Sequence, residues 1–491
     1  MGFHIKDRGA YQKVAEAFKK QQNGATVADI VAKTGLPLHT VKELVPLAAD
    51  EYSARLQVTE SGEILYSFPR GFASKYRGFR ASLRKFGEKL FKGLKIAGSA
   101  LFKIWIMLML VGYFVLFMLV ALASLLISVA GSSNSNSRSE HREGGGGLFF
   151  ASFIFDLIIR LWFYSELTKA VDQTYYGERT PRPKGKPLYK AIFSFVFGDE
   201  DPNKGWTSKE KQSVLAYLQA NQGVISLPEF MTLTGRTPQA AETAITAYCA
   251  EFGGLPEATE DGTVVYQFSD MLLRADRRDR SYSGASLLKR LPVFSSNTKG
   301  MNVWFCLLNG VNLAFGSYFL FNALNTGAIT AETQKTASYI YHVAYVLAQL
   351  VADNPLPFIT VGLGAIPVIF SVLFWLIPAV RYQAVKKGAE AIKLENLRKA
   401  GYGRIWSAPG AVASEDITAE ADICRPKNLP KAQDTIIKEM GSYTVPEVSL
   451  TDSGTTVYAF TELEREKEAL QKYRNRVHPQ TLGKTVFDSE T

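Results

Sequence analysis

The chain has 491 residues, of which 47% are hydrophobic and 21% charged, and this composition excludes a wholly disordered chain, a collagen and a coiled-coil rod. Its three cysteines, Cys249, Cys306 and Cys424, form no Cys-x-x-Cys pair, which excludes a disulfide scaffold and a cysteine zinc site. The formal net charge is +10. Such a charge suits a nucleic-acid partner, an acidic membrane surface or positive-inside topology, and only the positions of the charges decide among them.

Three uncharged stretches predict membrane-spanning helices. Each is at least 23 residues long, more than the roughly 20 needed to cross a bilayer, and they are residues 104–130, 301–324 and 358–380. A fourth stretch, 148–164, is shorter and contains Asp156 and Arg160. Alone it would suit an interfacial helix, but the charges on its flanks favour a fourth span. No secretory signal peptide is expected, because the first 20 residues are charged and lack an apolar segment.

Basic residues collect on one side of these spans. Four segments together carry 30 basic and 7 acidic residues, a balance of +23, and they are 70–103, 169–192, 274–300 and 381–404. The segments expected on the other side, 131–147 and 325–357, carry three basic residues between them. The positive-inside rule therefore predicts a multi-pass protein of a bacterial plasma (inner) membrane, with both termini and residues 165–300 in the cytoplasm.

A soluble module is used three times. Residues 1–69 (module 1) align with 206–269 (module 2) at an offset of 200, and 417–463 (module 3) repeats the second half. Each copy has a turn with the pattern Thr-acidic-x-Gly, which ends at Gly62, Gly262 or Gly454. A Tyr-x-Phe sequence follows each turn. Apolar periodicity predicts three helices, and alternation around the glycine predicts a β-hairpin. This order is that of a winged helix.

The expected fold is thus a membrane protein, mostly α with small β-hairpins, made of four transmembrane helices and three winged-helix-like (α+β) cytoplasmic modules. In module 3 we expect the second and third helices at 417–423 and 431–440, with the first drawn from 383–400 or lost. The remaining segments are a basic amphipathic juxtamembrane helix at 70–103 and external loops at 131–147 and 325–357. Cytoplasmic linkers are expected at 165–205, 270–300 and 381–416, and a charged tail at 464–491.

The charge of the modules argues against nucleic acid as a partner. Module 1 has 8 basic and 8 acidic residues up to position 68, module 2 has 3 and 7, and module 3 has 4 and 7. The third helix of module 2, 238–252, has no basic residue at all. A protein that reads DNA needs lysine and arginine on that helix and on the wing. Protein contact is the favoured role.

One stretch carries a family resemblance. The sequence Phe-Ser-Phe-Val-Phe-Gly-Asp-Glu-Asp-Pro-Asn at 193–203, with the later Leu255-Pro-Glu and Tyr266-x-Phe268, resembles a family of uncharacterised membrane proteins of bacteria, cyanobacteria and plastids. Glu200 stands where that family has glycine. The resemblance covers about 75 residues. It implies membrane location and a cytoplasmic or stromal module beside the spans, and it implies no activity.

Oxygen-bearing side chains stand at the spacing of a calcium loop, namely Asp199, Asp201, Asn203, Thr207 and Glu210. The position that needs glycine for the sharp turn is Lys204. An acidic turn leading into a capping box, Thr207-x-x-Glu210, explains the pattern better. We therefore expect no metal ion and no cofactor.

Polar residues inside the spans form a second candidate site. Asp156 and Arg160 stand at i, i+4 and can pair on one helix face, either as a structural ion pair or as a functional one. Asn309 and Asn312 lie one turn apart in the third span and are expected to hydrogen-bond to them.

Residues 79–97 have the pattern of an interfacial helix. An apolar stripe runs through Phe79, Leu83, Phe86, Leu90 and Leu94. Basic residues lie largely off this stripe and are expected to contact anionic lipid headgroups: Arg80, Arg84, Lys85, Lys89, Lys92 and Lys95. A second amphipathic run, 340–351, is nearly uncharged and is expected to pack on the outer surface of the bundle.

No catalytic motif is present, so no enzyme is predicted. The favoured function is an integral membrane scaffold or assembly protein that presents its modules to a protein partner or to a second copy. Two alternatives stay open. One is a membrane-tethered regulator that binds nucleic acid through its basic collars, and the other is a small transporter or channel built on Asp156 and Arg160.

Overall fold

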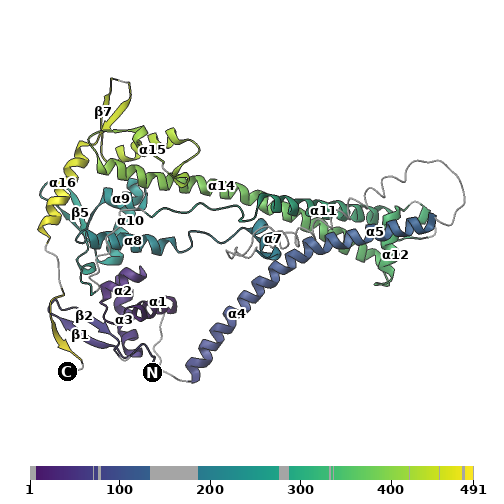
Figure 1. Ribbon diagram of the computed structural model, residues 1–491, viewed down its shortest axis with the longest axis horizontal. Coiled ribbons are helices and arrows are strands. Elements are labelled where there is room, and N and C mark those ends of the chain that lie inside the picture. The colour runs from purple at the N-terminus through teal and green to yellow at the C-terminus, as the bar shows by residue number, and fades with distance from the viewer. Residues whose placement is uncertain are drawn as a thin grey trace, which may run out of the picture. The chain divides into compact units, whose positions relative to one another are not determined.

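The computed structural model describes residues 7–69, 71–75, 79–132, 186–275, 287–330, 333–335, 337–419, 421–452, 454–477 and 482–489. The fold is mostly helical with three small sheets (Figure 1). The chain forms two compact units. Unit 1 comprises Met1–Gly87, Glu200–Pro292 and Lys386–Thr491, and unit 2 comprises Glu88–Asp199 and Val293–Val385.

Module 1 has the predicted order of three helices and a hairpin: α1 (Arg8–Lys20), α2 (Val27–Thr34), α3 (Leu38–Glu51), β1 (Arg55–Thr59) and β2 (Ile64–Ser67). Helix α2 begins with a capping box between Thr26 and Asp29 and ends at Gly35, which adopts the left-handed conformation with φ 65°. The hairpin turns at Gly62, where φ is 82°.

Module 2 adds a short strand after its first helix: α8 (Trp206–Ala220), β3 (Val224–Ser226), α9 (Leu227–Thr234), α10 (Pro238–Phe252), β4 (Leu255–Ala258) and β5 (Val264–Gln267). Its sheet has the order β3-β5-β4 and is antiparallel throughout. In module 1 a single bridge between Ala25 and Tyr66 takes the place of the β3–β5 pairing.

Module 3 contains β6 (Val412–Ala413), α15 (Leu429–Gly441), β7 (Glu447–Leu450) and β8 (Thr456–Ala459), with sheet order β6-β8-β7. The helix predicted at 417–423 is wrong, because its described residues are not α-helical and only the 3-10 turn Asp422–Cys424 begins there. Arg425 precedes Pro426, and a residue before proline avoids the helical region. Its backbone is extended, so no helix continues through it.

Two segments predicted as linker and tail are regular structure. Residues 381–407 belong to α14 (Ile366–Ser407), since their alanine, lysine, glutamate and leucine favour helix despite the high charge. The tail forms α16 (Thr461–Arg476) and a strand, β9 (Thr485–Asp488).

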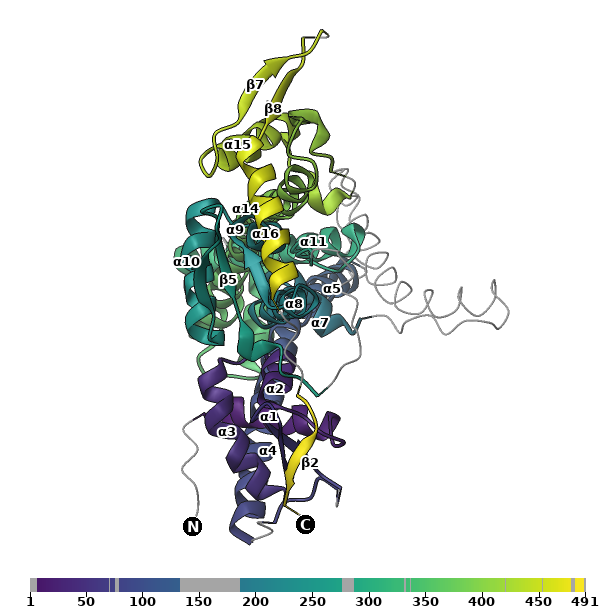
Figure 2. The same cartoon turned by 90° about the vertical axis from the view of Figure 1, so that its left-hand side faces the viewer.

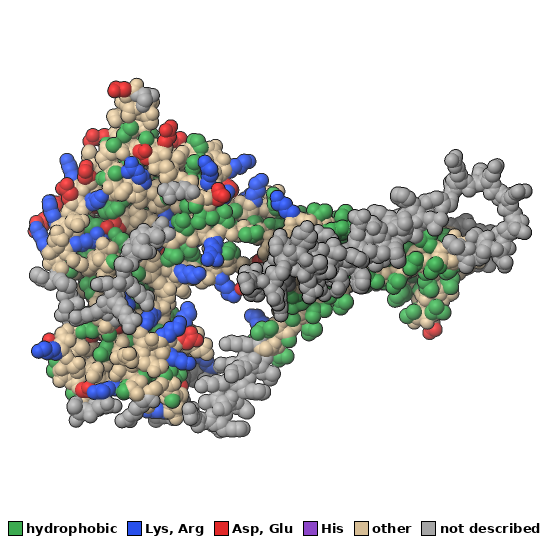
Figure 3. Space-filling model, in the orientation of Figure 1, with side chains coloured by type: hydrophobic (Ala, Val, Ile, Leu, Met, Phe, Trp, Pro, Cys, Tyr) green, Lys and Arg blue, Asp and Glu red, His purple; other side chains and the backbone are tan. Residues whose placement is uncertain are grey.

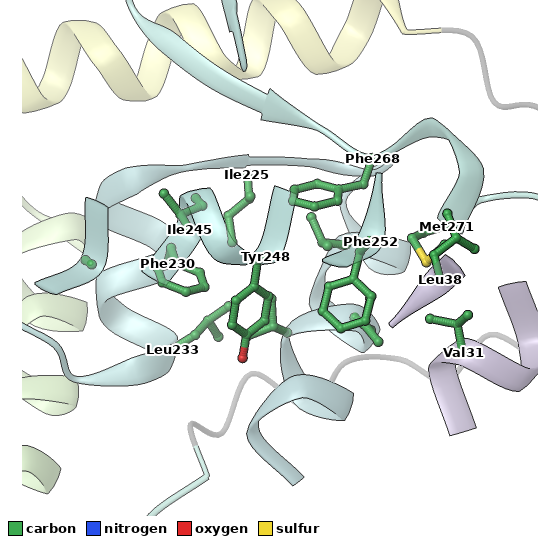
Figure 4. Packing of buried hydrophobic residues seen from close by; sticks show 14 of the residues in the cluster. Val31, Leu38, Ile225, Phe230, Leu233, Ile245, Tyr248, Phe252, Phe268 and Met271 are labelled. Carbon is green, nitrogen blue, oxygen red and sulfur yellow. The ribbon is translucent and has the colours of Figure 1, made fainter. Parts of the chain in front are cut away.

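One hydrophobic core runs through the three modules of unit 1. In Figure 4, Phe230, Tyr248 and Phe252 of module 2 pack together, while Val31 and Leu38 of module 1 belong to the same cluster. The modules therefore share buried surface, which stabilises their mutual contacts by roughly 25 cal/mol for each Å² of apolar area removed from water.

Unit 2 contains the apolar helices: the unit-2 part of α4 (Phe79–Met107), the π-helical turn η1 (Leu108–Gly112), α5 (Tyr113–Ser132), α7 (Leu188–Phe197), α11 (Lys299–Thr326), α12 (Tyr339–Gln349), the π-helical η4 (Phe358–Ala365) and the start of α14. Among the described residues, three helical stretches are long and apolar enough to span a membrane: Gly93–Ser128, Lys299–Thr326 and Pro355–Ser407. The fourth predicted span, 148–164, lies outside the described residues. In Figure 3, hydrophobic side chains dominate the visible described surface of unit 2, whereas charged ones gather over unit 1.

The residues predicted as an interfacial helix, 79–97, lie in α4, which runs on through η1 into α5 as one helical stretch. The amphipathic run 340–351 forms α12, whose buried face carries Tyr341, Ala344 and Ala348. These side chains share a cluster with Phe117 and Phe319 of the long helices.

Candidate protein-contact surfaces

Asp199, Asp201, Asn203 and Glu210, four of the five residues at calcium-loop spacing, bind other groups of the chain. Asp199 accepts hydrogen bonds from Lys186, Ser194 and Ser296. Asn203 exchanges two hydrogen bonds with the backbone of Arg290, at 2.7 and 2.9 Å. Within the described ranges there is no group of three or more His, Cys, Asp or Glu side chains placed to hold a metal ion.

The capping box predicted at Thr207 and Glu210 is absent. Helix α8 starts at Trp206, after Gly205 in the left-handed conformation with φ 77°, so Thr207 already lies within the helix. Glu210 is buried and binds Arg236 at 2.7 Å and the indole N–H of Trp206 at 3.2 Å. This carboxylate holds the start of α8 against the loop between α9 and α10.

The ring of Trp206 also faces two cations of neighbouring segments. The ammonium groups of Lys289 and Lys399 lie 5.4 and 4.8 Å from its centroid. Lys399 is 2% exposed and donates to the carbonyl of Leu287 at 2.7 Å. These contacts attach the polar half of α14 to module 2, and nothing in the spacing of the sequence indicates them.

The Phe-Gly-Asp motif forms a junction in unit 2. Helix α7 ends at Phe197, and the guanidinium of Arg381 donates to three of its last carbonyls and to the carbonyl of Phe294. A Cβ on Gly198 would lie 2.7 Å from that guanidinium, so glycine is needed there. Partial burial opposes the charge of Asp199, but hydrogen bonds from Lys186 and Ser194 hold its pKa below the ordinary value.

The asparagines of α11, a candidate membrane span, bind backbone carbonyls of neighbouring helices. The amide of Asn309 donates to Ser371 at 2.9 Å, and that of Asn312 donates to Leu110 at 2.8 Å. Leu110 lies in the π-helical turn η1, which changes the backbone hydrogen-bond pattern of the first span. The expected partners Asp156 and Arg160 lie outside the described residues, so that part of the prediction is untested.

Of the predicted lipid-contacting residues, the structure describes the side chain of Lys95, which is exposed. Arg80, Arg84, Lys85, Lys89 and Lys92 lie on α4. Nearby apolar side chains of α4 are also exposed, including Phe91, Leu94 and Ile96. An exposed apolar surface of this kind on a helix suits contact with lipid.

Module 1 binds the segment that follows module 2 through a buried carboxylate. Asp29, fully buried, accepts a hydrogen bond from the guanidinium of Arg274 at 2.8 Å and another from the backbone of Ala275 at 2.9 Å. The hydroxyl of Thr26 donates to the carbonyl of Leu273. The N-terminal cap of α2 thus also serves as the binding site for the segment that follows module 2.

Helix α16 binds module 2 in the same way. Arg474 forms a bidentate pair with Glu229 at 2.9 and 2.6 Å and donates to the carbonyl of Val224. The side chains of Arg474 and Glu229 are only 14% and 4% exposed. A bidentate arginine–carboxylate pair is both strong and directional. Leu470 of α16 completes a small apolar cluster with the sheet of module 2.

Strand β9 adds to the free edge of the module 1 hairpin. It pairs antiparallel with β1, giving the sheet order β2-β1-β9. Asp488 is held by Arg55, with Nε–Oδ1 at 2.8 Å, and by the amide of Gln57 at 2.8 Å. The amide of Ser489 donates to the carbonyl of Leu56 at 2.9 Å. The outer edge of the module 1 hairpin therefore binds an extended segment of the same chain.

Comparison with known proteins gives one distant likeness. The chain is 22% identical over 414 residues to an uncharacterised chloroplastic protein of Arabidopsis thaliana, a match that covers 82% of this chain and 73% of that protein. No protein-family profile matches the chain. No solved structure matches it. The likeness supports the resemblance to an uncharacterised group of proteins that includes a plastid one.

Proposed function

We propose that the chain is an integral membrane scaffold or assembly protein, in which three winged-helix-like modules bind other proteins at the cytoplasmic or stromal face. The order of helices and strands in modules 1 and 2 supports the winged-helix assignment. The partial third module takes its first helix from the end of α14. The alignment of modules 1 and 2 at an offset of 200 supports duplication.

The observation that carries the proposal is the chemistry of α10. This helix occupies the place of the recognition helix in a DNA-binding winged helix, and its only charged side chains are Glu242 and Glu251. Glu251 forms an ion pair with Lys211. A helix without positive charge gains nothing from the phosphates of DNA. The polar contacts of Asp29, Glu229 and β1 are instead made to other segments of the same chain, which supports surfaces of the modules that suit protein contact.

The membrane part of the proposal is four spans with both termini on the cytoplasmic side, in a bacterial inner membrane or its plastid equivalent. The three apolar helices and the basic segments 70–103, 274–300 and 381–404 support this topology. The fourth span, 148–164, is required to keep residues 165–300 on the cytoplasmic side of the membrane, together with the other basic segments.

The test is purification of the tagged full-length chain from native membranes in mild detergent, with nuclease treatment, cross-linking and mass spectrometry. We expect a stoichiometric protein that cross-links to lysines of the modules, such as Lys431 and Lys438 of α15, and that survives the nuclease. Recovery of the chain alone, or of a partner lost on nuclease treatment, would contradict the proposal.

A further inference from the structure

The edge of β1 sets the pattern for strand addition. In an antiparallel hairpin, residues alternate between those that bond to the partner strand and those whose backbone groups point away. The amide of Thr59 donates to Glu63 across the hairpin, so the backbone groups of Val58 and Leu56 point outward. Leu56 accepts the amide of Ser489 on that outer side.

In the hairpin of module 3, inward and outward backbone groups alternate in the same order relative to the turn. The amide of Thr451 donates to Thr455, as that of Thr59 does to Glu63. The backbone groups of Val448 and Leu450 therefore point away from β8. Strand β7 is the last in its sheet, and no strand of the described chain pairs with its outer side. In Figure 2 the β7–β8 hairpin projects beyond α15, the helix of the same module.

The side chains of β7 are also free to take part. Val448 and Leu450 are 62% and 74% exposed, an unusual surface for an edge strand, which natural proteins normally protect with charge, proline or a cover. Another edge strand, β4, differs because Pro256 stands at the outward position that Val448 holds in β7, and proline has no amide to donate to an added strand. The edge of β7 is the better candidate for a partner.

Charge specifies the occupant. Arg55 of β1 holds the acidic Asp488, and at the offset of 392 between the two hairpins the residue that corresponds to Arg55 is Glu447. Module 3 as a whole has 4 basic and 7 acidic residues. We infer that the outer edge of β7 binds an extended segment of a partner protein, antiparallel to β7, with lysine or arginine where β9 has Asp488. This inference rests on the proposed scaffold function and names the chemistry of its partner.

The test uses two labelled peptides and the full-length chain in detergent. One peptide, Lys-Thr-Val-Phe-Asp-Ser, copies residues 484–489, and the other replaces its aspartate with lysine. By fluorescence anisotropy, the lysine peptide should bind roughly twofold to fivefold more tightly, the range of one partly exposed ion pair. Glu447→Lys should reverse this preference. Equal binding of both peptides, or a preference unchanged by Glu447→Lys, would overturn the inference.

Leu450→Pro supplies the matched backbone test. It removes an outward amide without touching the bonds to β8, so the hairpin should persist while peptide binding is lost. Circular dichroism and the melting temperature check that the variant is folded, and a lysine peptide N-methylated at alternate amides gives the same test on wild-type protein. Unchanged binding in both experiments would overturn the inference.

Two further outcomes separate this inference from the proposed function. If the wild type is a dimer and Leu450→Pro converts it to a monomer, a second copy occupies the edge of β7. That result would overturn the inference of a basic partner protein. A partner that cross-links to the modules of both wild type and Leu450→Pro equally would leave the scaffold standing and exclude the β7 edge. Failure to recover any partner would instead count against the scaffold itself.

Discussion

The hairpins β1–β2 and β7–β8 have the same turn and the same backbone phase, yet one carries a third strand on its outer edge and the other does not. The difference lies in the side chains along that edge. Arg55 and Gln57 hold Asp488 of β9, whereas Glu447 and Ser449 stand at the corresponding places of β7. The backbone makes an edge able to bind a strand, and the charge beside it selects which strand binds.

Deleting residues 482–491 should make the two edges alike, and this is the largest effect we expect. Without β9, the outward amide of Leu56 loses its partner Ser489 and should exchange with solvent on the order of 10- to 100-fold faster. Hydrogen exchange with mass spectrometry measures this on the full-length protein. The peptide that copies residues 484–489 should restore protection when added in trans. Exchange that stays slow after the deletion would contradict the assignment of β9.

Reversing one charge should have a smaller effect. Arg55→Glu places two carboxylates together at the partly buried site of Asp488, and we expect β9 to be weakened by about 1–2 kcal/mol. The double variant Arg55→Glu, Asp488→Arg should recover at least half of the lost protection in a double-mutant cycle. No recovery would mean that packing, not charge, holds the strand.

A substitution at Gly483, just before β9, should weaken the strand less again. Gly483 has φ 70°, and a Cβ there would meet the carboxylate of Glu60. Gly483→Ala should weaken β9 by about 1 kcal/mol through backbone strain and displacement of that side chain. Gly454→Ala is the matched control, because Gly454 has φ 79° in the β7–β8 turn with nothing within 4 Å. Faster exchange in β1 should follow only the first substitution.

The smallest expected effect is a pH dependence of the β7–β8 hairpin, set by a carboxylate of α16. Tyr443, which precedes β7, donates to Glu466, and burial raises the pKa of Glu466 to about 7. An acid with a raised pKa stabilises the fold at low pH and loses that contribution as pH rises from about 4.5 through 7. The β7–β8 amides should therefore exchange faster at pH 8 than at pH 5.5, after correction for intrinsic rates. Glu466→Gln should remove this difference, and a β1–β2 hairpin that responds equally would contradict it.

Local sequence signals predicted the elements that depend on near neighbours. The uncharged runs around 301–324 and 358–380 lie in candidate spans, and the Gly62, Gly262 and Gly454 turns each join two strands. For 381–416 the sequence left open a basic linker or a first helix of module 3 at 383–400, because a helix with a charged surface and a solvated linker have similar compositions; α14 covers 383–400.

Contacts between distant residues were not predictable from spacing. Arg381 and Gly198 are 183 positions apart, and Asp29 and Arg274 are 245 apart, so no motif links them. The composition of 464–491 predicts a charged tail and gives no sign of strand β9, because four residues are too few for a periodic signal. The one available clue was Thr-Val-Phe at 485–487, a β-forming triplet near the end of a polar segment.

The most direct measurement is hydrogen exchange at Val448 and Leu450 in the full-length protein, before and after addition of the partner identified by cross-linking. We expect both amides to exchange quickly in the protein alone and to become protected when the partner binds, while the amide of Leu56 stays protected throughout. A partner that binds stoichiometrically and leaves the exchange of β7 unchanged would contradict the claim that these modules bind proteins through their strand edges.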